Sequence, residues 1–355
     1  MTLIDDLRLE ALALWLRRDL GRPVLRIEVA SADASFRRYF RVFEASGAAV
    51  GGVSTVIAMD APPDKENIEP YLHVVRMLAS TGVHVPTVHA ADLSQGFVLL
   101  EDLGNTSYLA SLHAGADPDA RYGEALAALA DIQVLGQAAA RELPPYDAAV
   151  LEREMQLMPE WFCARHLRLS LRLDEQALLR ASFDFLIGEA LKQPQVLVHR
   201  DYHSRNLMLT TTRNPGVIDF QDALRGPLGY DLVSLLKDCY IQWPRERVEG
   251  WLRGHRLRIA ARGLDGGASE REFLRWFDLS GVQRHFKVLG IFARLWYRDG
   301  KAGYLADLPL TLHYLRDACA RYGELQNLAR WLEQRVVPLL APANAREQNV
   351  RAPPT

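Results

Sequence analysis

Hydrophobic and polar positions follow two different patterns along the chain. Up to about Leu103, apolar residues alternate with polar ones or form short apolar runs, which is the pattern of β-strands. From Gly104 onward, apolar residues recur mostly every three or four positions, which predicts helices. The chain is therefore expected to be α+β, with a small antiparallel sheet followed by a mainly helical part. The expected strands span 25–29, 36–42, 55–59 and 97–100.

The same pattern suggests how the chain is divided. We expect an N-terminal lobe over residues 1–103 and a helical lobe over 104–342. Residues 343–355 are mostly polar, lack periodicity and end in Pro353-Pro354, so a disordered tail is expected there. Apolar residues at helical spacing predict helices at 4–14, 72–78, 122–133, 151–173, 175–191 and 280–297. Pro159 interrupts the helix predicted at 151–173.

Composition excludes several classes of protein. The 355 residues are 49% hydrophobic and 24% charged with a net charge of −2, so neither nucleic acid nor an anionic membrane is an expected partner. The three cysteines lie far apart without CxxC spacing, which argues against a disulfide framework or a zinc site. The acidic first turns are unlike a signal peptide, and no run of about 18 apolar residues occurs. A cytoplasmic protein is therefore predicted.

One segment carries a specific arrangement of polar residues between apolar strands. A short strand at 196–198 leads into His199-Arg200-Asp201, and Asn206 follows five residues after Asp201. After a turn at Asn214-Pro215-Gly216, a second apolar stretch delivers Asp219. Two strands joined by a turn are expected to bring Asp201, Asn206 and Asp219 together.

Phosphoryl transfer requires side chains of this kind. Magnesium prefers oxygen ligands, so Asn206 and Asp219 are the candidate metal ligands. Asp201 is the candidate base that orients the acceptor hydroxyl and takes its proton, and His199 is expected to brace the loop. The spacing matches the H-R-D-x-x-x-x-N pattern of kinase catalytic loops. The alternative is a hairpin in which Asp and Asn only cap turns.

The catalytic segment resembles the aminoglycoside phosphotransferase and choline kinase family, which has a bilobal protein-kinase-like fold. The segments Ala34-Ser35-Phe36-Arg37-Arg38-Tyr39-Phe40-Arg41 and Gln283-Arg284-His285-Phe286-Lys287-Val288-Leu289-Gly290 also resemble one branch of it, the bacterial anomeric N-acetylmuramate and N-acetylglucosamine kinases of cell-wall recycling. The resemblance implies ATP and Mg²⁺ as cofactors and a small sugar as acceptor, phosphorylated to the α-1-phosphate. It covers about residues 30–312.

The resemblance also implies where ATP binds. The turn between the first two strands is expected to cover the phosphates, and the hinge around Glu101 and Leu103 to meet the adenine through its backbone. A plain polar hairpin is the alternative for the turn, which contains no glycine. The turn consists of Ser31, Ala32, Asp33, Ala34 and Ser35.

Here the sequence departs from the kinase pattern. Met59 stands on the third strand, where kinases place a phosphate-binding lysine. Lys65, Arg38 or Arg41 could supply the positive charge, or the site lacks one. Glu66 and Glu69 could pair with such a cation, or only complement the dipole of the next helix.

The acceptor contacts are less defined by sequence. Asp201, His203 and Arg205 of the loop and Arg294 and Trp296 of a later helix are the candidates. Arginine and tryptophan suit a sugar bearing a carboxylate and an acetamido group, although a solvated helix face explains either one alone.

Two other functions remain open at this stage. A kinase of the same fold could act on choline, homoserine or an aminoglycoside. A nucleotide-binding pseudokinase is the second alternative, suggested by the missing lysine and by Gln221 in place of the glycine of D-F-G. Neither the choice of ATP over GTP nor the oligomeric state follows from the sequence.

Overall fold

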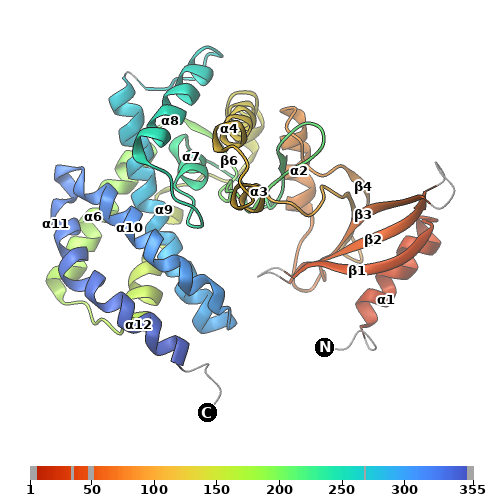
Figure 1. Cartoon of the computed structure of the whole chain (residues 1–355), viewed down its shortest axis with the longest axis horizontal. Helices are drawn as coiled ribbons and strands as arrows, with labels where there is room; N and C mark the ends of the chain where they lie inside the picture. Colours follow the sequence, from red (N-terminus) through yellow and green to blue (C-terminus); the bar gives the residue numbers. More distant parts are fainter. Residues whose placement is uncertain (1–5, 33–35, 47–51, 268, 350–355) are drawn as a thin grey trace. The chain divides into compact units, whose positions relative to one another are not determined.

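The computed structural model describes residues 6–32, 36–46, 52–267 and 269–349. The chain forms two compact units, coloured along the sequence in Figure 1. The first unit contains the residues up to Thr106 together with Met208–Asp222, and the second contains Ser107–Leu207 and the residues from Ala223 onward. The predicted boundary at Leu103 is close to Thr106. The sequence did not predict that residues 208–222 belong to the first unit. Asp219 therefore lies in the first unit.

An antiparallel five-stranded sheet forms the centre of the first unit, with the strand order β1-β2-β3-β5-β4. Alternation or short apolar runs in the sequence predicted every strand of this sheet except β4. That strand reads VHAAD and contains a single β-branched residue, so it carries little strand signal. The strands are β1 (Val24–Ala32), β2 (Arg38–Ser46), β3 (Gly52–Asp60), β4 (Val88–Asp92) and β5 (Phe97–Glu101).

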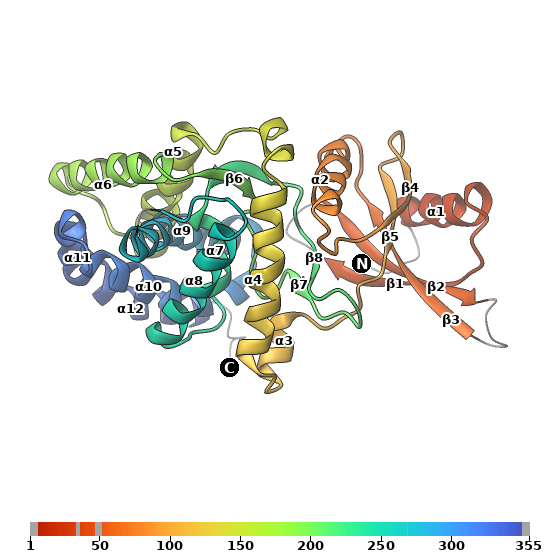
Figure 2. The same cartoon turned by 90° about the horizontal axis from the view of Figure 1, so that it is seen from above.

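Two helices accompany this sheet. α1 (Leu7–Leu14) begins at Asp6, whose side chain accepts a hydrogen bond from the backbone of Leu9, and it continues as a π-helical turn, η2 (Trp15–Asp19). Leu12 and Trp15 share one apolar core with sheet residues, so α1 is held by burial of its inner face. Figure 2 shows α1 beside the strands. α2 (Glu69–Ser80) has Pro70 in its first turn, as expected.

The second unit is mainly helical. A two-stranded antiparallel ladder, β6 (Gln195–Val198) with β9 (Leu224–Pro227), lies within it. Its helices are α3 (Tyr108–His113), α4 (Pro118–Leu135), α5 (Ala148–Leu157), α6 (Leu173–Leu191), α7 (Gly229–Leu236), α8 (Arg245–Ala260), α9 (Glu270–Asp299), α10 (Leu308–Ala320), α11 (Gln326–Trp331) and α12 (Val337–Asn349). Shorter 3-10 and π segments are η3 (Ala139–Glu142), η4 (Met158–His166), η5 (Ala302–Asp307), η6 (Gly323–Leu325) and η7 (Leu332–Val336).

α9 is the central helix of this unit. Most of its residues between Phe273 and Leu295 are buried, and it shares a core with residues of α5, α6 and α10. The periodicity predicted only its second half, over 280–297. A helix buried on nearly all sides explains why polar residues within it need partners. Although α9 has 30 residues, no helix in the described ranges is long and apolar enough to cross a membrane.

Gly290 allows α9 to pack closely against the end of α5. A Cβ atom at position 290 would overlap the backbone of Leu157. We therefore predict that Gly290→Ala lowers the free energy of unfolding by about 1–3 kcal/mol, because the two helices must separate. Chemical denaturation measures this. Gly281→Ala on the same helix is the control, since its Cβ would meet no atom closer than 3.7 Å. Equal costs at the two sites would contradict the packing argument.

The end of the chain differs from the sequence prediction. Residues 343–349 continue α12 to Asn349, where a disordered tail was expected. Ala343 is buried, and the Glu347 carboxylate accepts a hydrogen bond of 3.0 Å from the Trp296 indole. These contacts supply tertiary stabilisation that periodicity in a polar segment cannot reveal. Residues 350–355 lie outside the described ranges.

Candidate active site

The catalytic loop begins where β6 ends. Val196–Val198 are buried, so the apolar strand sets the start of the loop at His199. The backbone N–H of Asp201 donates to Nδ1 of His199 at 3.3 Å, which is the bracing role expected for this histidine. The Asn206 side-chain amide donates to the Asp201 backbone carbonyl at 3.0 Å, and the Asn206 backbone N–H donates to the His203 carbonyl at 2.8 Å. The loop therefore joins Asp201 and Asn206 by a hydrogen bond, and the expectation that Asp219 lies with them stays a prediction.

Asp231 holds the loop from α7. Its position at the start of the helix predicts an N-cap, and the family resemblance implies that it braces the loop. Leu228 occupies the N-cap position, and Asp231 lies in the first turn. Its two oxygens accept the backbone N–H groups of His199 at 2.7 Å and Arg200 at 3.0 Å. Burial raises the pKa of Asp231 to about 7, although both hydrogen bonds favour the ionised form. Arg200 has φ 76°, a left-handed conformation that these bonds help to maintain.

A buried group of charged side chains surrounds the loop, and sequence reasoning did not identify it. Arg284 on α9 lies 3.8 Å from the Asp201 carboxylate and donates to the Arg200 carbonyl at 3.0 Å. One turn along α9, Lys287 lies 3.2 Å from the buried Glu154 carboxylate and donates to the Tyr230 hydroxyl at 3.1 Å. Glu154 also accepts hydrogen bonds from Arg200, Gln283 and Tyr146. The available signal was two basic residues three positions apart in an apolar helix.

These charges control the protonation of Asp201. Burial would raise the pKa of the carboxyl, but Lys287 and Arg284, with smaller contributions from His203 and Arg200, lower it below its usual range. Because 36% of the side chain is exposed, solvent weakens each interaction. Asp201 is therefore ionised at neutral pH and able to accept a hydrogen bond from a hydroxyl group.

Removing one of these charges should move the pKa of Asp201. We predict that Arg284→Gln raises this pKa toward its ordinary value near 4, because a positive charge 3.8 Å from the carboxylate is lost. Asp201 then stays ionised between pH 5 and 9, so the shape of the kcat/KM profile in that range should not change. Titration of the Asp201 carboxyl by NMR below pH 5 measures the shift. Arg284→Lys keeps the charge and should leave the pKa in place, whereas an unchanged pKa in Arg284→Gln would contradict the electrostatic role.

Asp219 lies in the first unit, after the short hairpin of β7 (Leu207–Met208) and β8 (Gly216–Val217). Its φ is 66°, a left-handed conformation that is uncommon for aspartate and is often found at functional sites. Gln221 donates to the Asp219 carboxylate at 2.8 Å, and the neighbouring Phe220 packs on Tyr71 of α2 with ring centroids 5.0 Å apart. These contacts position the carboxylate within its own unit.

The donor set fits magnesium better than zinc. In the described part of the chain, no group of three or more His, Cys, Asp or Glu side chains is arranged to hold a metal ion. Mg²⁺ needs no such cage, because it is usually bound by one or two carboxylates together with phosphates and water. Asn206 uses its amide nitrogen within the loop, so its carbonyl oxygen is the atom that it could offer to a cation.

Two of the predicted phosphate-binding cations have carboxylate partners. Arg38 pairs with Asp6 and Asp60, and Arg41 binds Asp102 at 2.6 Å. Lys65 is half-exposed beside Asp64, 3.6 Å away. Of the predicted phosphate loop, Ser31 and Ala32 end β1, whereas Asp33, Ala34 and Ser35 lie outside the described residues.

A different arginine meets the acidic side chain next to α2. Arg37 lies 3.2 Å from Glu66, and both side chains are largely buried. This pair has the same charges as the kinase lysine–glutamate pair, but its arginine immediately precedes β2 and does not lie on the third strand. The sequence pattern indicated Glu66 but not Arg37, because the kinase pattern places the cation on the third strand.

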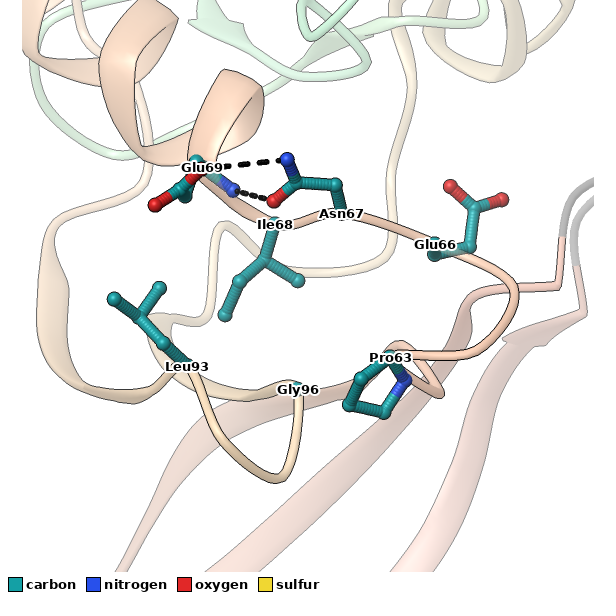
Figure 3. A pocket seen from close by; sticks show the side chains of 7 residues that line it. All are labelled: Pro63, Glu66, Asn67, Ile68, Glu69, Leu93 and Gly96. Atoms are coloured by element: carbon teal, nitrogen blue, oxygen red, sulfur yellow. Dashed lines mark hydrogen bonds between the residues drawn. The ribbon is translucent and has the colours of Figure 1, made fainter.

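The cavity beside Glu66 is too small for a nucleotide. Its volume is about 150 Å³, and Figure 3 shows the side chains that line it. Asn67 accepts from the Glu69 backbone at 2.9 Å, so these residues mainly shape the start of α2. Ligand pockets for small molecules measure several hundred Å³. The residues that line the cavity beside Glu66 are Pro63, Glu66, Asn67, Ile68, Glu69, Leu93 and Gly96.

The predicted hinge residues have partners within the first unit. Glu101 accepts hydrogen bonds from the His84 ring and the Thr87 hydroxyl at 2.9 and 2.8 Å, and Leu103 is buried. Their side chains thus serve packing, and a role in adenine binding through the backbone remains a prediction.

The candidate acceptor residues form two sets: His203 and Arg205 lie in the loop after β6, and Arg294 and Trp296 lie on α9. The Arg205 guanidinium stacks on the Tyr240 ring, 3.5 Å from its centroid, and the His203 ring meets the same tyrosine edge-on. Trp296 donates to Glu347 of α12, so packing accounts for its position. Arg294 is half-buried, and its Nε lacks a hydrogen-bond partner among the described residues. The structure brings His203 and Arg205 together on Tyr240, which sequence reasoning did not name.

Solved structures with this architecture are known. An ethanolamine kinase of Plasmodium vivax matches with a TM-score of 0.61 over 87% of each chain, at 14% identity. A choline kinase of Streptococcus pneumoniae matches with a TM-score of 0.59, covering 88% of this chain and 99% of its own at 12% identity. The antiparallel sheet followed by a helical part thus defines the protein-kinase-like fold, as predicted.

Sequence comparisons define the family. A model of the phosphotransferase enzyme family matches residues 26–277, and this chain belongs to that family. It is 45% identical over 338 residues to the N-acetylmuramate/N-acetylglucosamine kinase of Pseudomonas aeruginosa, covering 92% of this chain and 97% of the relative. The kinase of the same name from Neisseria meningitidis is also 45% identical, over 88% of this chain and 92% of its own.

Proposed function

We propose that this protein is an ATP-dependent kinase that phosphorylates the anomeric hydroxyl of N-acetylmuramate and N-acetylglucosamine. The observation that carries the proposal is 45% identity over 92% of the chain to a kinase of that name. The product would be the sugar α-1-phosphate, a cytoplasmic intermediate of cell-wall recycling toward UDP-sugars. An aminoglycoside phosphotransferase of the same fold, solved with ADP, supports nucleotide use.

The loop geometry supports a defined role for each residue. We assign Asp201 as the base that accepts the proton of the sugar hydroxyl while the hydroxyl oxygen bonds to the γ-phosphorus and the bond to ADP breaks. His199 and Asp231 hold the loop that presents this carboxylate. Asn206 and Asp219 would hold Mg²⁺, which neutralises charge on the transferring phosphoryl group. Arg37, paired with Glu66, is the best-supported phosphate-binding cation.

A panel of acceptors tests the proposal. ADP release from Mg-ATP would be measured with N-acetylmuramate, N-acetylglucosamine, glucosamine, choline, homoserine and kanamycin, and phosphorus NMR would identify the phosphorylated position. We expect turnover of the two N-acetyl sugars only, at the anomeric oxygen. Turnover of another acceptor would keep the chemistry and overturn the sugar assignment. No turnover with retained ATP binding would favour the pseudokinase, and GTP in place of ATP tests the nucleotide.

A further inference from the structure

An arginine beside the catalytic loop is positioned by an aromatic ring and not by a carboxylate. Arg205 follows Asp201 by four residues, and its guanidinium carbon lies 3.5 Å from the Tyr240 ring centroid. Within the described ranges of the chain, no carboxylate lies within salt-bridge distance of Arg205, whose side chain is exposed. A guanidinium held by stacking keeps its planar set of N–H donors directed at a ligand.

Tyr240 is the first of a row of aromatic rings from three elements. His203 of the catalytic loop lies 5.5 Å from its centroid at 79°. The Tyr240 ring centroid also lies 6.4 Å from that of Phe292 of α9, and the Tyr304 ring of η5 is 5.2 Å from Phe292. Tyr240 and Tyr304 are both partly exposed. Partly exposed rings are typical surfaces for the apolar face of a sugar.

Two carboxylates lie in the same region, and one of them, Asp238, accepts the backbone N–H groups of Ser204 and Tyr240 at 2.9 Å. Asp307 ends η5 and is half-buried, and burial raises the pKa of its carboxyl to about 6 while Arg205 acts to lower it. The positive charges that act most strongly on Asp201 are those of Lys287 and Arg284. Arg205 is not among the charges that act most strongly on Asp201, and its guanidinium is held on Tyr240.

The two proposed acceptors differ in one substituent of this kind. N-acetylmuramate carries a lactyl ether with a carboxylate, and N-acetylglucosamine has a neutral hydroxyl at that position. We propose that Arg205, stacked on Tyr240, binds the lactyl carboxylate and sets the preference between the two sugars. This inference rests on the proposed function. A fork of two N–H donors matches a carboxylate in geometry and charge, whereas the neutral sugar offers no such partner.

The test is the ratio of kcat/KM for N-acetylmuramate to kcat/KM for N-acetylglucosamine. Arg205→Gln should lower this ratio about 10- to 100-fold, because a charged hydrogen-bonded pair is lost for one sugar only. Asp307→Asn should raise the ratio about 2- to 5-fold, since a repelling charge is removed. Opposite changes from the two variants would not arise from a loss of folding. Arg26→Gln is the matched control, because Arg26 also stacks 3.5 Å from a ring, that of Phe43 in the first unit.

Each other outcome is informative. An equal loss for both sugars in Arg205→Gln, or an unchanged ratio, would overturn the role of Arg205. A lowered ratio in Arg294→Gln but not in Arg205→Gln would assign the carboxylate to Arg294 instead. If the unaltered protein phosphorylates neither sugar, the proposed function fails and this inference fails with it. If it phosphorylates both and only the ratio test fails, the proposed function stands.

Discussion

Asp201→Asn is expected to lower kcat for N-acetylmuramate by about 10²- to 10⁴-fold, the usual contribution of general base catalysis. The amide has the shape of the carboxylate but cannot accept the proton of the sugar hydroxyl. It also removes the negative charge that faces Arg284 at 3.8 Å. The measurement is steady-state turnover at saturating ATP, together with nucleotide binding by calorimetry. ATP binding should persist, because no proposed ATP contact is changed.

Asp184→Asn is the matched control for this substitution. Asp184 is an exposed aspartate on α6, so its replacement should change neither turnover nor ATP binding. A loss smaller than about tenfold in Asp201→Asn would show that the proton leaves by another route, since even weak general base catalysis exceeds this factor. Loss of ATP binding in that variant would instead indicate a collapsed loop.

The local part of the site could be predicted from the sequence. Asp201 and Asn206 lie five residues apart. The hydrogen bond from the Asn206 side chain to the Asp201 carbonyl lies within that loop. Local spacing therefore determines much of their geometry. The local pattern alone could not give the contacts of Asp231, because the bonded groups are about 30 residues away along the chain, and the bracing role was implied only by the family resemblance. An aspartate at the start of a helix has the same sequence signal whether it caps the helix or holds a loop.

The buried charges around the loop could not be predicted in this way. Glu154 and Lys287 are 133 positions apart, and only packing of α5 on α9 brings them within 3.2 Å. The same limit applies to Arg37 and Glu66, because Arg37 immediately precedes β2 and does not lie on the third strand, where kinases place the lysine. Periodicity identifies which face of a helix is buried, but it does not identify which polar groups meet there.

The hydrophobic pattern was most reliable where elements are long or strictly alternating. It predicted strands within β1, β2, β3 and β5, and it failed at β4 and at the end of α12. Both failures concern segments rich in alanine or polar residues, whose structure depends on contacts with distant residues such as Trp296. Residues 208–222 also belong to the first unit because of such contacts. One of them is the hydrogen bond from the Val217 backbone N–H to the His84 carbonyl at 2.7 Å.

Asp219→Asn is expected to lower kcat about 100-fold or more and to raise the Mg²⁺ concentration needed for half-maximal activity. The carboxylate is a strong ligand for a hard cation, whereas the neutral amide is a weak one. Asparagine tolerates the left-handed backbone at φ 66°, and its oxygen can still accept the hydrogen bond from Gln221. The substitution therefore changes the charge with little change in conformation. Turnover measured across a Mg²⁺ titration tests the expectation.

The control for this prediction is Asp222→Asn, in the same segment of the first unit. Asp222 is exposed and has an ordinary backbone conformation, so its replacement should leave the Mg²⁺ dependence unchanged. A reduced kcat in Asp219→Asn with an unaltered Mg²⁺ requirement would remove Asp219 from the metal site. It would then favour a structural role for the strained turn that Phe220 anchors on α2. A raised Mg²⁺ requirement in Asp219→Asn alone would instead support the pairing of this carboxylate with the Asn206 amide around one ion.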